Sequence, residues 1–238
     1  MGLSSKKLSP GKLYCDLLTP DEQVAYRLLL EGLRKRSTDI EINLRRDEMD
    51  SIKRAIEAIH LDYPDLFYVE YCRCKVRKRD TGSAIKFDYL YTPAQSCQIE
   101  RMLSDAWAAL EKKLSPQMPA KKQYRIIALE IASMVRYLKT GDAADYSVVN
   151  PIMRHTGVCE GVSKLFLYYC NRAGLPAWVT VGKYEGVNHS WNRVWLRGKE
   201  KYLDLTVLQQ CPFLFRLFPG LIMLPGRLFC RLGYVFRD

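Results

Sequence analysis

The first half of the chain mixes helical and strand-like hydrophobic patterns. Apolar residues at helical spacing predict helices from about 20 to 35, 49 to 59 and 93 to 114. The first and third begin at Thr19-Pro20 and Thr92-Pro93, with Glu or Gln three positions after each Thr, as in a capped helix start. Residues 38–43 and the hairpin 72–89 alternate as strands do. We therefore expect a small α+β lobe over residues 13–118, with a proline-containing linker at its end.

The second half predicts helices that are followed by a sheet. Helical spacing covers residues 121–139 and a stretch that starts at Cys159, and a polar loop, 141–150, lies between them. Strand patterns follow at 177–183, 189–196 and 201–205, joined by short turns. The expected fold class is α+β, with a cysteine-bearing helix packed on an antiparallel sheet over residues 119–210.

The two ends of the chain differ from this body. We expect residues 1–12, which are polar and contain proline and glycine, to form a flexible arm. Residues 211–238 are rich in apolar side chains, but the run 213–225 is too short and too broken for a membrane span. Packing of this segment on the body is the favoured interpretation. Peripheral contact with a lipid surface and binding of a partner are the alternatives.

Composition and cysteine content bound the class of protein. Hydrophobic residues make up 48% and charged residues 26% of the chain, as in ordinary globular proteins. Eight cysteines occur without an apolar signal segment, so we expect reduced thiols and a cytoplasmic protein. Cys72 and Cys74 lie too close for the usual zinc spacing, and their alternation predicts a shared apolar strand face. Neither a metal-ligand cluster nor a cofactor is expected.

Positive charge is concentrated in the second half. Residues 1–120 hold 20 Lys and Arg against 18 Asp and Glu, whereas residues 121–238 hold 17 against 8. Such a field favours acidic protein surfaces, nucleic acid or anionic lipid, although solubility alone would also explain it. The sequence lacks a nucleic-acid recognition motif, so no specific nucleic-acid partner is expected.

Three residues are candidates for covalent catalysis. Cys159 begins a helix, whose N-terminal charge and N–H groups favour a thiolate and an oxyanion, and Gly157 and Gly161 leave room for close backbone approach. His189 starts a strand and is the candidate base, with His155 as the alternative. Asp204 either orients His189 or closes a turn onto Thr206. A buried structural role would explain any one of the three alone.

Three blocks of sequence resemble those of the transglutaminase-like superfamily, which has a papain-type fold. They are 157–163 around Cys159, 188–194 around His189, and 202–206 around Asp204. The resemblance implies a Cys159–His189–Asp204 triad, with Gly157, Val158, Trp191 and Asn192 at the substrate cleft. The first half resembles the lobe that precedes this domain in bacterial members. The chain departs from many relatives at Val207 and at Arg136-Tyr137, which concerns the cleft walls and not the triad.

The favoured hypothesis is therefore a thiol enzyme that acts on amide bonds through an acyl-enzyme. Hydrolysis of a peptide or isopeptide, with acidic substrates as candidates, is preferred over protein crosslinking, because crosslinking needs a second site for an amine. The resemblance also admits an amide-linked glycan as the substrate. A non-catalytic interaction module on the same fold and a basic nucleic-acid binder are the competing hypotheses.

Overall fold

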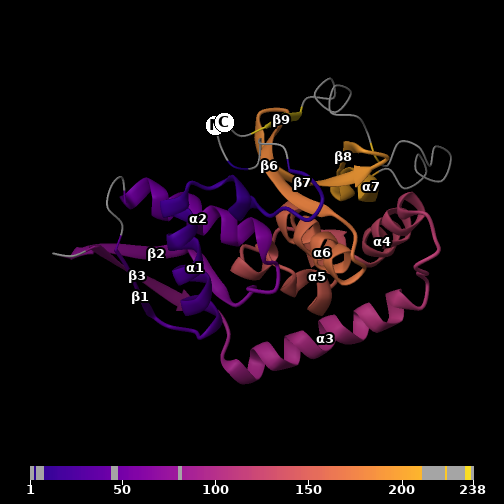
Figure 1. The fold of residues 1–238 in the computed structure, drawn as a ribbon. Helices are drawn as coiled ribbons and strands as arrows, with labels where there is room; N and C mark the ends of the chain where they lie inside the picture. Colours follow the sequence, from indigo (N-terminus) through magenta and orange to yellow (C-terminus); the bar gives the residue numbers. More distant parts are fainter. Residues whose placement is uncertain are drawn as a thin grey trace. The chain divides into compact units, whose positions relative to one another are not determined.

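The computed structural model describes residues 3, 8–43, 48–79, 82–210, 223 and 234–236. Contacts divide the chain into an N-terminal unit, Lys6–Ser96, and a C-terminal unit, which combines Cys97–Asp238 with Met1–Ser5. The division runs through helix α3 (Pro93–Glu111), whereas the sequence pattern places the boundary after residue 118 (Figure 1). Both units combine helices with antiparallel strands.

The N-terminal unit joins two helices to a three-stranded antiparallel sheet. Its strands lie in the order β1-β3-β2, and helix α1 packs against α2. Its elements are the 3-10 helix η2 (Tyr14–Leu17), α1 (Pro20–Arg34), β1 (Asp39–Ile42), α2 (Glu48–Asp62), β2 (Val69–Arg79) and β3 (Gly82–Tyr89). The predicted helices, strand and hairpin of this half are thus present, and the hairpin turn itself, 80–81, lies outside the described residues.

Side-chain caps begin the helices where the sequence predicts them. Thr19 Oγ1 accepts from Glu22 N at 3.4 Å, and Glu22 Oε2 accepts from Thr19 N at 2.9 Å. Thr92 and Gln95 form the same reciprocal pair at the start of α3. The prediction that the Cys72 and Cys74 thiols share an apolar face was wrong. Cys72 is exposed, because the pairing of β2 with β3 shifts register between Glu70 and Lys75.

The C-terminal unit is built on a four-stranded antiparallel sheet in the order β8-β7-β6-β9. Helix α6 packs on strands β6 and β7 (Figure 1), and α4 packs on α6. The elements are α4 (Ala120–Met134), β4 (Arg136–Tyr137), the 3-10 helix η3 (Ala143–Tyr146), α5 (Val149–Met153), β5 (Thr156–Gly157), α6 (Cys159–Arg172), β6 (Ala177–Tyr184), β7 (Val187–Leu196), β8 (Lys199–Leu203), α7 (Leu205–Gln210) and β9 (Tyr234–Phe236). The expected core, a cysteine-bearing helix on an antiparallel sheet, is confirmed.

Two stretches of this unit differ from the sequence prediction. The helix that was predicted to reach residue 139 ends at Met134, because Val135 is extended and the next two residues pair in parallel with β5. The expected polar loop, 141–150, contains η3 and the start of α5. Both differences shape the backbone that leads to Cys159.

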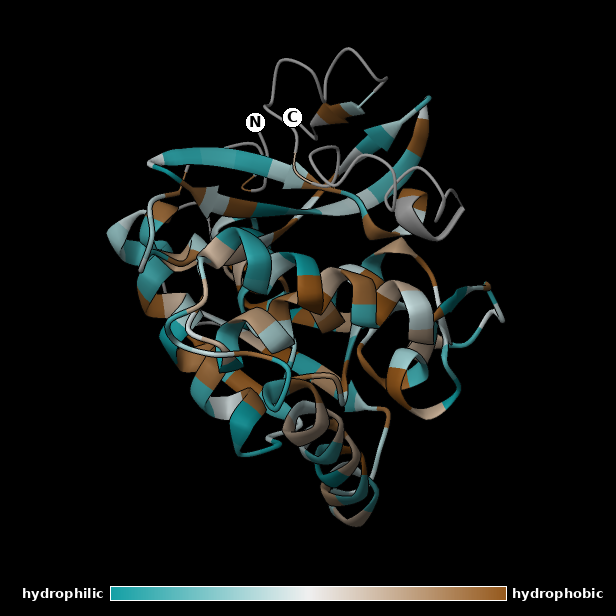
Figure 2. Ribbon diagram, turned by 90° about the vertical axis from the view of Figure 1, so that its right-hand side faces the viewer, coloured by the Kyte–Doolittle hydropathy of each residue, from teal (hydrophilic) through white to brown (hydrophobic). Residues whose placement is uncertain are grey.

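Apolar and polar residues alternate along the helices in Figure 2, as expected for elements that bury one side. Among the described residues, no helix is both long enough and apolar enough to span a membrane. Residues 1, 2 and 4–7 of the predicted arm lie outside the described residues, and its described part includes Leu3 and Leu8, which are buried. Most of the apolar segment, 211–238, also lies outside the described residues. The described part of that segment includes β9, which pairs with β6.

Candidate active site

Cys159 is the first residue of α6 and follows directly after β5. The preceding residue, Val158, has extended backbone angles and provides no side-chain cap. The start of α6 therefore places its partial positive charge and its first N–H groups next to the Cys159 thiol. The N-cap residue forms no side-chain hydrogen bond to these N–H groups. Cys159 is partly exposed, as a nucleophile must be.

A buried carboxylate organises the backbone beside Cys159. Asp145 accepts hydrogen bonds from the backbone N–H groups of Thr140 and Gly141 and from the Asn150 amide, at 2.7 to 3.0 Å. A Cβ on Gly161 would lie 2.4 Å from the Asp145 carbonyl oxygen, so only glycine allows α6 to approach this loop. The need for glycine was predicted. Asp145 was missed, because the loop around it looks only polar in sequence.

His189 lies on the central strand β7, opposite Gly182 of β6. Its Nε2 donates a hydrogen bond to Asp204 Oδ2 at 2.6 Å. The ring lies nearly parallel to the indole of Trp191, with ring centroids 6.2 Å apart. One ring nitrogen is thus held by Asp204, and the structure brings together the two residues that the sequence proposed as base and orienter.

Asp204 lies after the end of β8 and immediately before α7, and not within an apolar strand as predicted. Its Oδ2 accepts from His189 and from the Tyr234 hydroxyl, the latter at 2.7 Å. Its Oδ1 accepts from the Thr206 backbone N–H at 2.9 Å and from Thr206 Oγ1 at 2.6 Å. The two interpretations of Asp204 are therefore both realised: one oxygen holds the imidazole and the other closes the turn.

The electrostatics of the site couple these groups. Burial alone would lower the pKa of His189, but hydrogen bonding to Asp204 and Cys159 and their negative charge raise it to about 10. Burial alone would raise the pKa of Asp204. The bonds from His189, Thr206 and Tyr234 outweigh burial and hold that pKa below its usual value. The arrangement thus favours an imidazolium paired with a carboxylate at neutral pH.

Residues 108–205 match the family model of the transglutaminase-like superfamily. This part of the chain belongs to the transglutaminase-like superfamily. The matched range contains Cys159, His189 and Asp204 and ends at the first residue of α7. No curated protein matches the chain.

Two solved structures are similar to parts of the chain. One is described as a TGase, with 15% identity, a TM-score of 0.41, and coverage of 71% of this chain and 50% of that one. The other is a candidate protease from Parabacteroides distasonis, with 10% identity, a TM-score of 0.34, and coverage of 55% and 33%. The chain thus spans half the length of the first and a third of the second. These likenesses are too distant to inform on activity.

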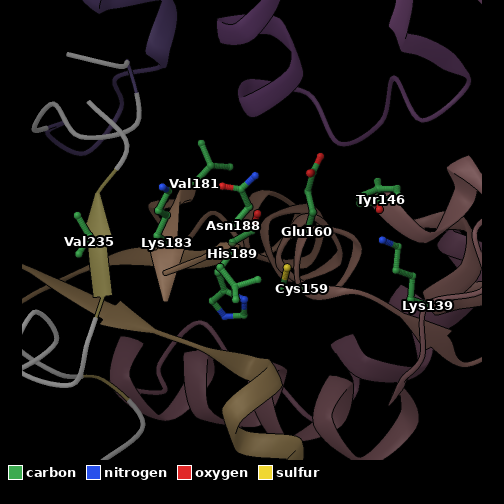
Figure 3. A pocket seen from close by; sticks show the side chains of 12 residues that line it. Lys139, Tyr146, Cys159, Glu160, Val181, Lys183, Asn188, His189 and Val235 are labelled. Atoms are coloured by element: carbon green, nitrogen blue, oxygen red, sulfur yellow. The ribbon is translucent and has the colours of Figure 1, made fainter. Parts of the chain in front are cut away.

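A cavity of about 800 Å³ opens over the transglutaminase-like site. Cys159 and His189 both line it, as Figure 3 shows. Lys139 and Tyr146 line one side. The other described lining residues are Glu160, Val181, Gly182, Lys183, Val187, Asn188, Ser190 and Val235. The candidate nucleophile and base are therefore accessible to a substrate from the same opening.

The residues that the family resemblance places at the cleft lie behind this cavity. Gly157, Val158, Trp191 and Asn192 are buried and are not among its described lining residues. Trp191 packs against Tyr202 and Tyr234, and the Asn192 amide donates to the Ser163 carbonyl at 3.0 Å. Asn192 thus bonds β7 to α6, and Trp191 packs β7 against β8 and β9, so both support the strand that carries His189.

The structure also separates the remaining candidates from the site. His155 is exposed, has a positive φ of 53°, and is not among the described residues that line the cavity. His60 packs edge-on against Tyr71 in the N-terminal unit. Within the described ranges, no group of three or more His, Cys, Asp and Glu residues is placed to hold a metal ion. Tyr234 was missed by sequence reasoning, because the apolar segment around it shows no pattern that marks a site.

Proposed function

We propose that the protein is a thiol enzyme that acts on amide bonds through an acyl-enzyme on Cys159, with hydrolysis as its main reaction. The observation that carries this proposal is the 2.6 Å hydrogen bond between His189 and Asp204, at a cavity that also exposes the Cys159 thiol. A cysteine nucleophile requires a base within reach and a group that orients the base. The match of residues 108–205 to the transglutaminase-like family model, a range that contains all three residues, supports this proposal.

The proposed reaction has two steps. The Cys159 thiolate attacks the amide carbonyl carbon, and the oxyanion is stabilised by N–H groups at the start of α6. The C–N bond breaks as His189 donates its proton to the leaving amine, which leaves a thioester on Cys159. His189 then takes a proton from water as the water oxygen attacks the thioester, and the C–S bond breaks to release a carboxylic acid and the Cys159 thiolate, which restores the ion pair with the protonated His189. Asp204 keeps the imidazole oriented throughout and stabilises its charged form.

Transfer of the acyl group to an amine is the alternative outcome. Two lysines line the cavity, and their charge repels an amine that arrives as an ammonium ion. This observation favours water as the acceptor. Acetylation of Cys159 by p-nitrophenyl acetate and analysis of the products with and without added methylamine separates the two outcomes. Acetate as the main product supports hydrolysis, whereas acetylated methylamine as the main product shows transfer.

Alkylation by iodoacetamide at pH 7, followed by mass spectrometry of each cysteine peptide, tests the proposed nucleophile. Cys159 should react fastest, and its rate should fall about a hundredfold in His189→Ala. Cys15 is an internal control, because burial and the nearby Asp62 raise the pKa of its thiol. Equal reactivity of Cys159 and Cys15, or a rate that is unchanged in His189→Ala, would exclude this enzyme function and favour an interaction module.

A further inference from the structure

Two lysine side chains line the cavity on opposite sides of the Cys159 thiol. Lys139 follows β4, and Lys183 lies near the end of β6. Figure 3 shows Cys159 and His189 between the two lysines. Both lysines are exposed, so their ammonium groups can reach a molecule that occupies the cavity.

Backbone pairing fixes each lysine relative to a reacting residue. Lys183 pairs with Asn188 in the β6–β7 register, directly beside the pair of Gly182 with His189. On the other side, Leu138 N donates to the Gly157 carbonyl at 3.1 Å, so Lys139 follows a residue bonded two positions before Cys159. The backbone positions of both lysines are therefore fixed relative to His189 and Cys159.

The charge of the cavity is positive. Glu160 is the one acidic side chain among its described lining residues. Its Oε1 accepts from Lys164 Nζ at 2.8 Å, and Lys164 also donates to the Tyr146 carbonyl at 3.2 Å. This pair balances its own charge. No described carboxylate lies within ion-pair distance of Lys139 or Lys183, so those two charges face the cavity contents.

We propose that the cavity selects an acidic peptide segment, with carboxylates on both sides of the amide that reacts with Cys159. This inference rests on the proposed function and names its substrate class. A segment that crosses the thiol brings one carboxylate toward Lys139 and another toward Lys183. Because both lysines are exposed, each contact changes affinity by about threefold. The same charges disfavour basic peptides, so specificity arises from attraction and repulsion together.

Two alkylating reagents of nearly equal size measure the effect of the two lysine charges at the Cys159 thiol. Iodoacetate is an anion and iodoacetamide is neutral. The rate of Cys159 alkylation by iodoacetate divided by the rate with iodoacetamide therefore reports the local charge, and the measurement does not require turnover. In Lys139→Gln/Lys183→Gln the ratio should fall about fivefold to tenfold, and division by the iodoacetamide rate corrects for any change in the reactivity of the thiol. Lys122→Gln is the matched control, because Lys122 is exposed in the same unit but does not line the cavity. Its ratio should equal that of the wild type.

Protection of Cys159 by synthetic peptides tests the substrate class. Three pentapeptides carry a central Gln flanked on each side by two Glu, two Ser or two Lys residues. The Glu peptide should slow iodoacetamide labelling at the lowest concentration and the Lys peptide at the highest. In Lys139→Glu/Lys183→Glu this order should reverse.

The outcomes separate the inference from the proposed function. One possible result is that Cys159 is labelled fast, that this rate depends on His189, and that the double Gln variant keeps the wild-type rate ratio. The substrate inference then fails and the enzyme proposal stands. The inference also fails if the three peptides protect alike. If Cys159 reacts no faster than Cys15, the enzyme proposal fails, whatever the ratio shows. A lowered ratio together with preferential protection by the Glu peptide supports the inference.

Discussion

The two units each contain a cysteine and a buried aspartate that bonds a tyrosine, yet the electrostatics of the two clusters differ. In the N-terminal unit, Asp62 accepts from the Tyr26 hydroxyl at 2.9 Å and from the Tyr14 and Cys15 backbone N–H groups at 2.8 and 3.2 Å. In the C-terminal unit, Asp204 accepts from the Tyr234 hydroxyl and from Thr206. The neutral donors around the two carboxylates are thus similar.

The difference is a histidine. Desolvation raises the pKa of Asp62 to about 6, because its neutral hydrogen-bond donors do not offset burial. His189 adds a cation to the Asp204 cluster, and the pKa of Asp204 shifts the other way. Cys15 has a raised pKa beside Asp62, whereas Cys159 lies at a helix start on a cavity that it shares with His189. A thiol beside a carboxylate alone thus has a raised pKa, and under the proposed function the imidazole is what makes the second cluster reactive.

The largest expected contrast is between Asp204→Asn and Asp62→Asn. Loss of the Asp204 charge removes the group that orients and charges His189, so iodoacetamide labelling of Cys159 at pH 7 should slow about a hundredfold. Asp62→Asn should change that rate by less than about twofold, because independent sites contribute separately. Equal effects of the two substitutions would mean that the His189–Asp204 pair is structural.

The pH dependence of unfolding gives the next largest contrast. The folded pKa is raised for Asp62, from 3.8 to about 6, and for His189, from 6.5 to about 10. Each group therefore stabilises the fold below its unfolded pKa, and this stability is lost as the pH rises through the folded pKa. Relative to Asp62→Asn, the wild type should lose about 3 kcal/mol of unfolding free energy between about pH 3 and 7, most of it between about pH 4 and 6. Relative to His189→Gln, the wild type should lose unfolding free energy as the pH rises from about 6.5 to about 10.

Urea unfolding at a series of pH values measures both windows. Asp204 has the opposite sign, since its lowered pKa gives stability above pH 3.8 that is lost on acidification. The difference in unfolding free energy between the wild type and Asp62→Asn could instead stay constant from about pH 4 to 6. That result would show that Asp62 titrates normally, and the contrast between the two carboxylates would then disappear.

The helices and strands of this site are easier to predict from the sequence than the contacts between them. Periodicity and caps predict α1, α3 and α6, because those signals act within a few neighbouring residues. The start of α6 at Cys159 was correct for the same reason. The pairing of β9 with β6 was not predictable, because Tyr234 and Asp204 are 30 positions apart in sequence and no local pattern specifies the strand with which a distant segment pairs.

The residues that line the cavity are also difficult to predict from the sequence. Gly157, Val158, Trp191 and Asn192 lie within the blocks that resemble the family, but Trp191 and Asn192 contact buried partners in the structure. Lys139 and Lys183 line the cavity, because β4 pairs with β5 and β6 pairs with β7. Such non-local pairings do not appear in the local pattern of either segment.

Two helical glycines provide a contrast of intermediate size. A Cβ on Gly161 would meet backbone oxygens of Asp145 at 2.4 Å and Ser147 at 2.7 Å, which cannot move without disturbing the approach to Cys159. Gly161→Ala should therefore cost about 2 kcal/mol of stability and slow labelling of Cys159. The three nearest atoms that a Cβ on Gly32 would meet all belong to the Ile40 side chain, which can shift more easily than backbone atoms can.

The gain in helix propensity of about 1 kcal/mol should then leave Gly32→Ala close to the wild type. Chemical denaturation of the two variants, with labelling of Cys159 measured in parallel, makes the comparison. A Gly161→Ala protein as stable and as reactive as Gly32→Ala would mean that the loop beside Cys159 yields easily, contrary to the dense hydrogen bonding around Asp145.

The smallest expected contrast is between the two phenols, Tyr234→Phe and Tyr26→Phe. Each substitution removes one hydroxyl donor from a buried aspartate, so each should cost about 1 kcal/mol of stability. Only Tyr234→Phe also raises the pKa of the carboxylate that holds His189, and it should slow Cys159 labelling by about threefold to tenfold. Tyr26→Phe is the matched control, with the same chemistry at Asp62. If both variants lose stability and neither changes labelling, Tyr234 only supports the packing of β9. A slower rate in Tyr234→Phe alone would instead identify it as a residue that positions the Asp204–His189 pair.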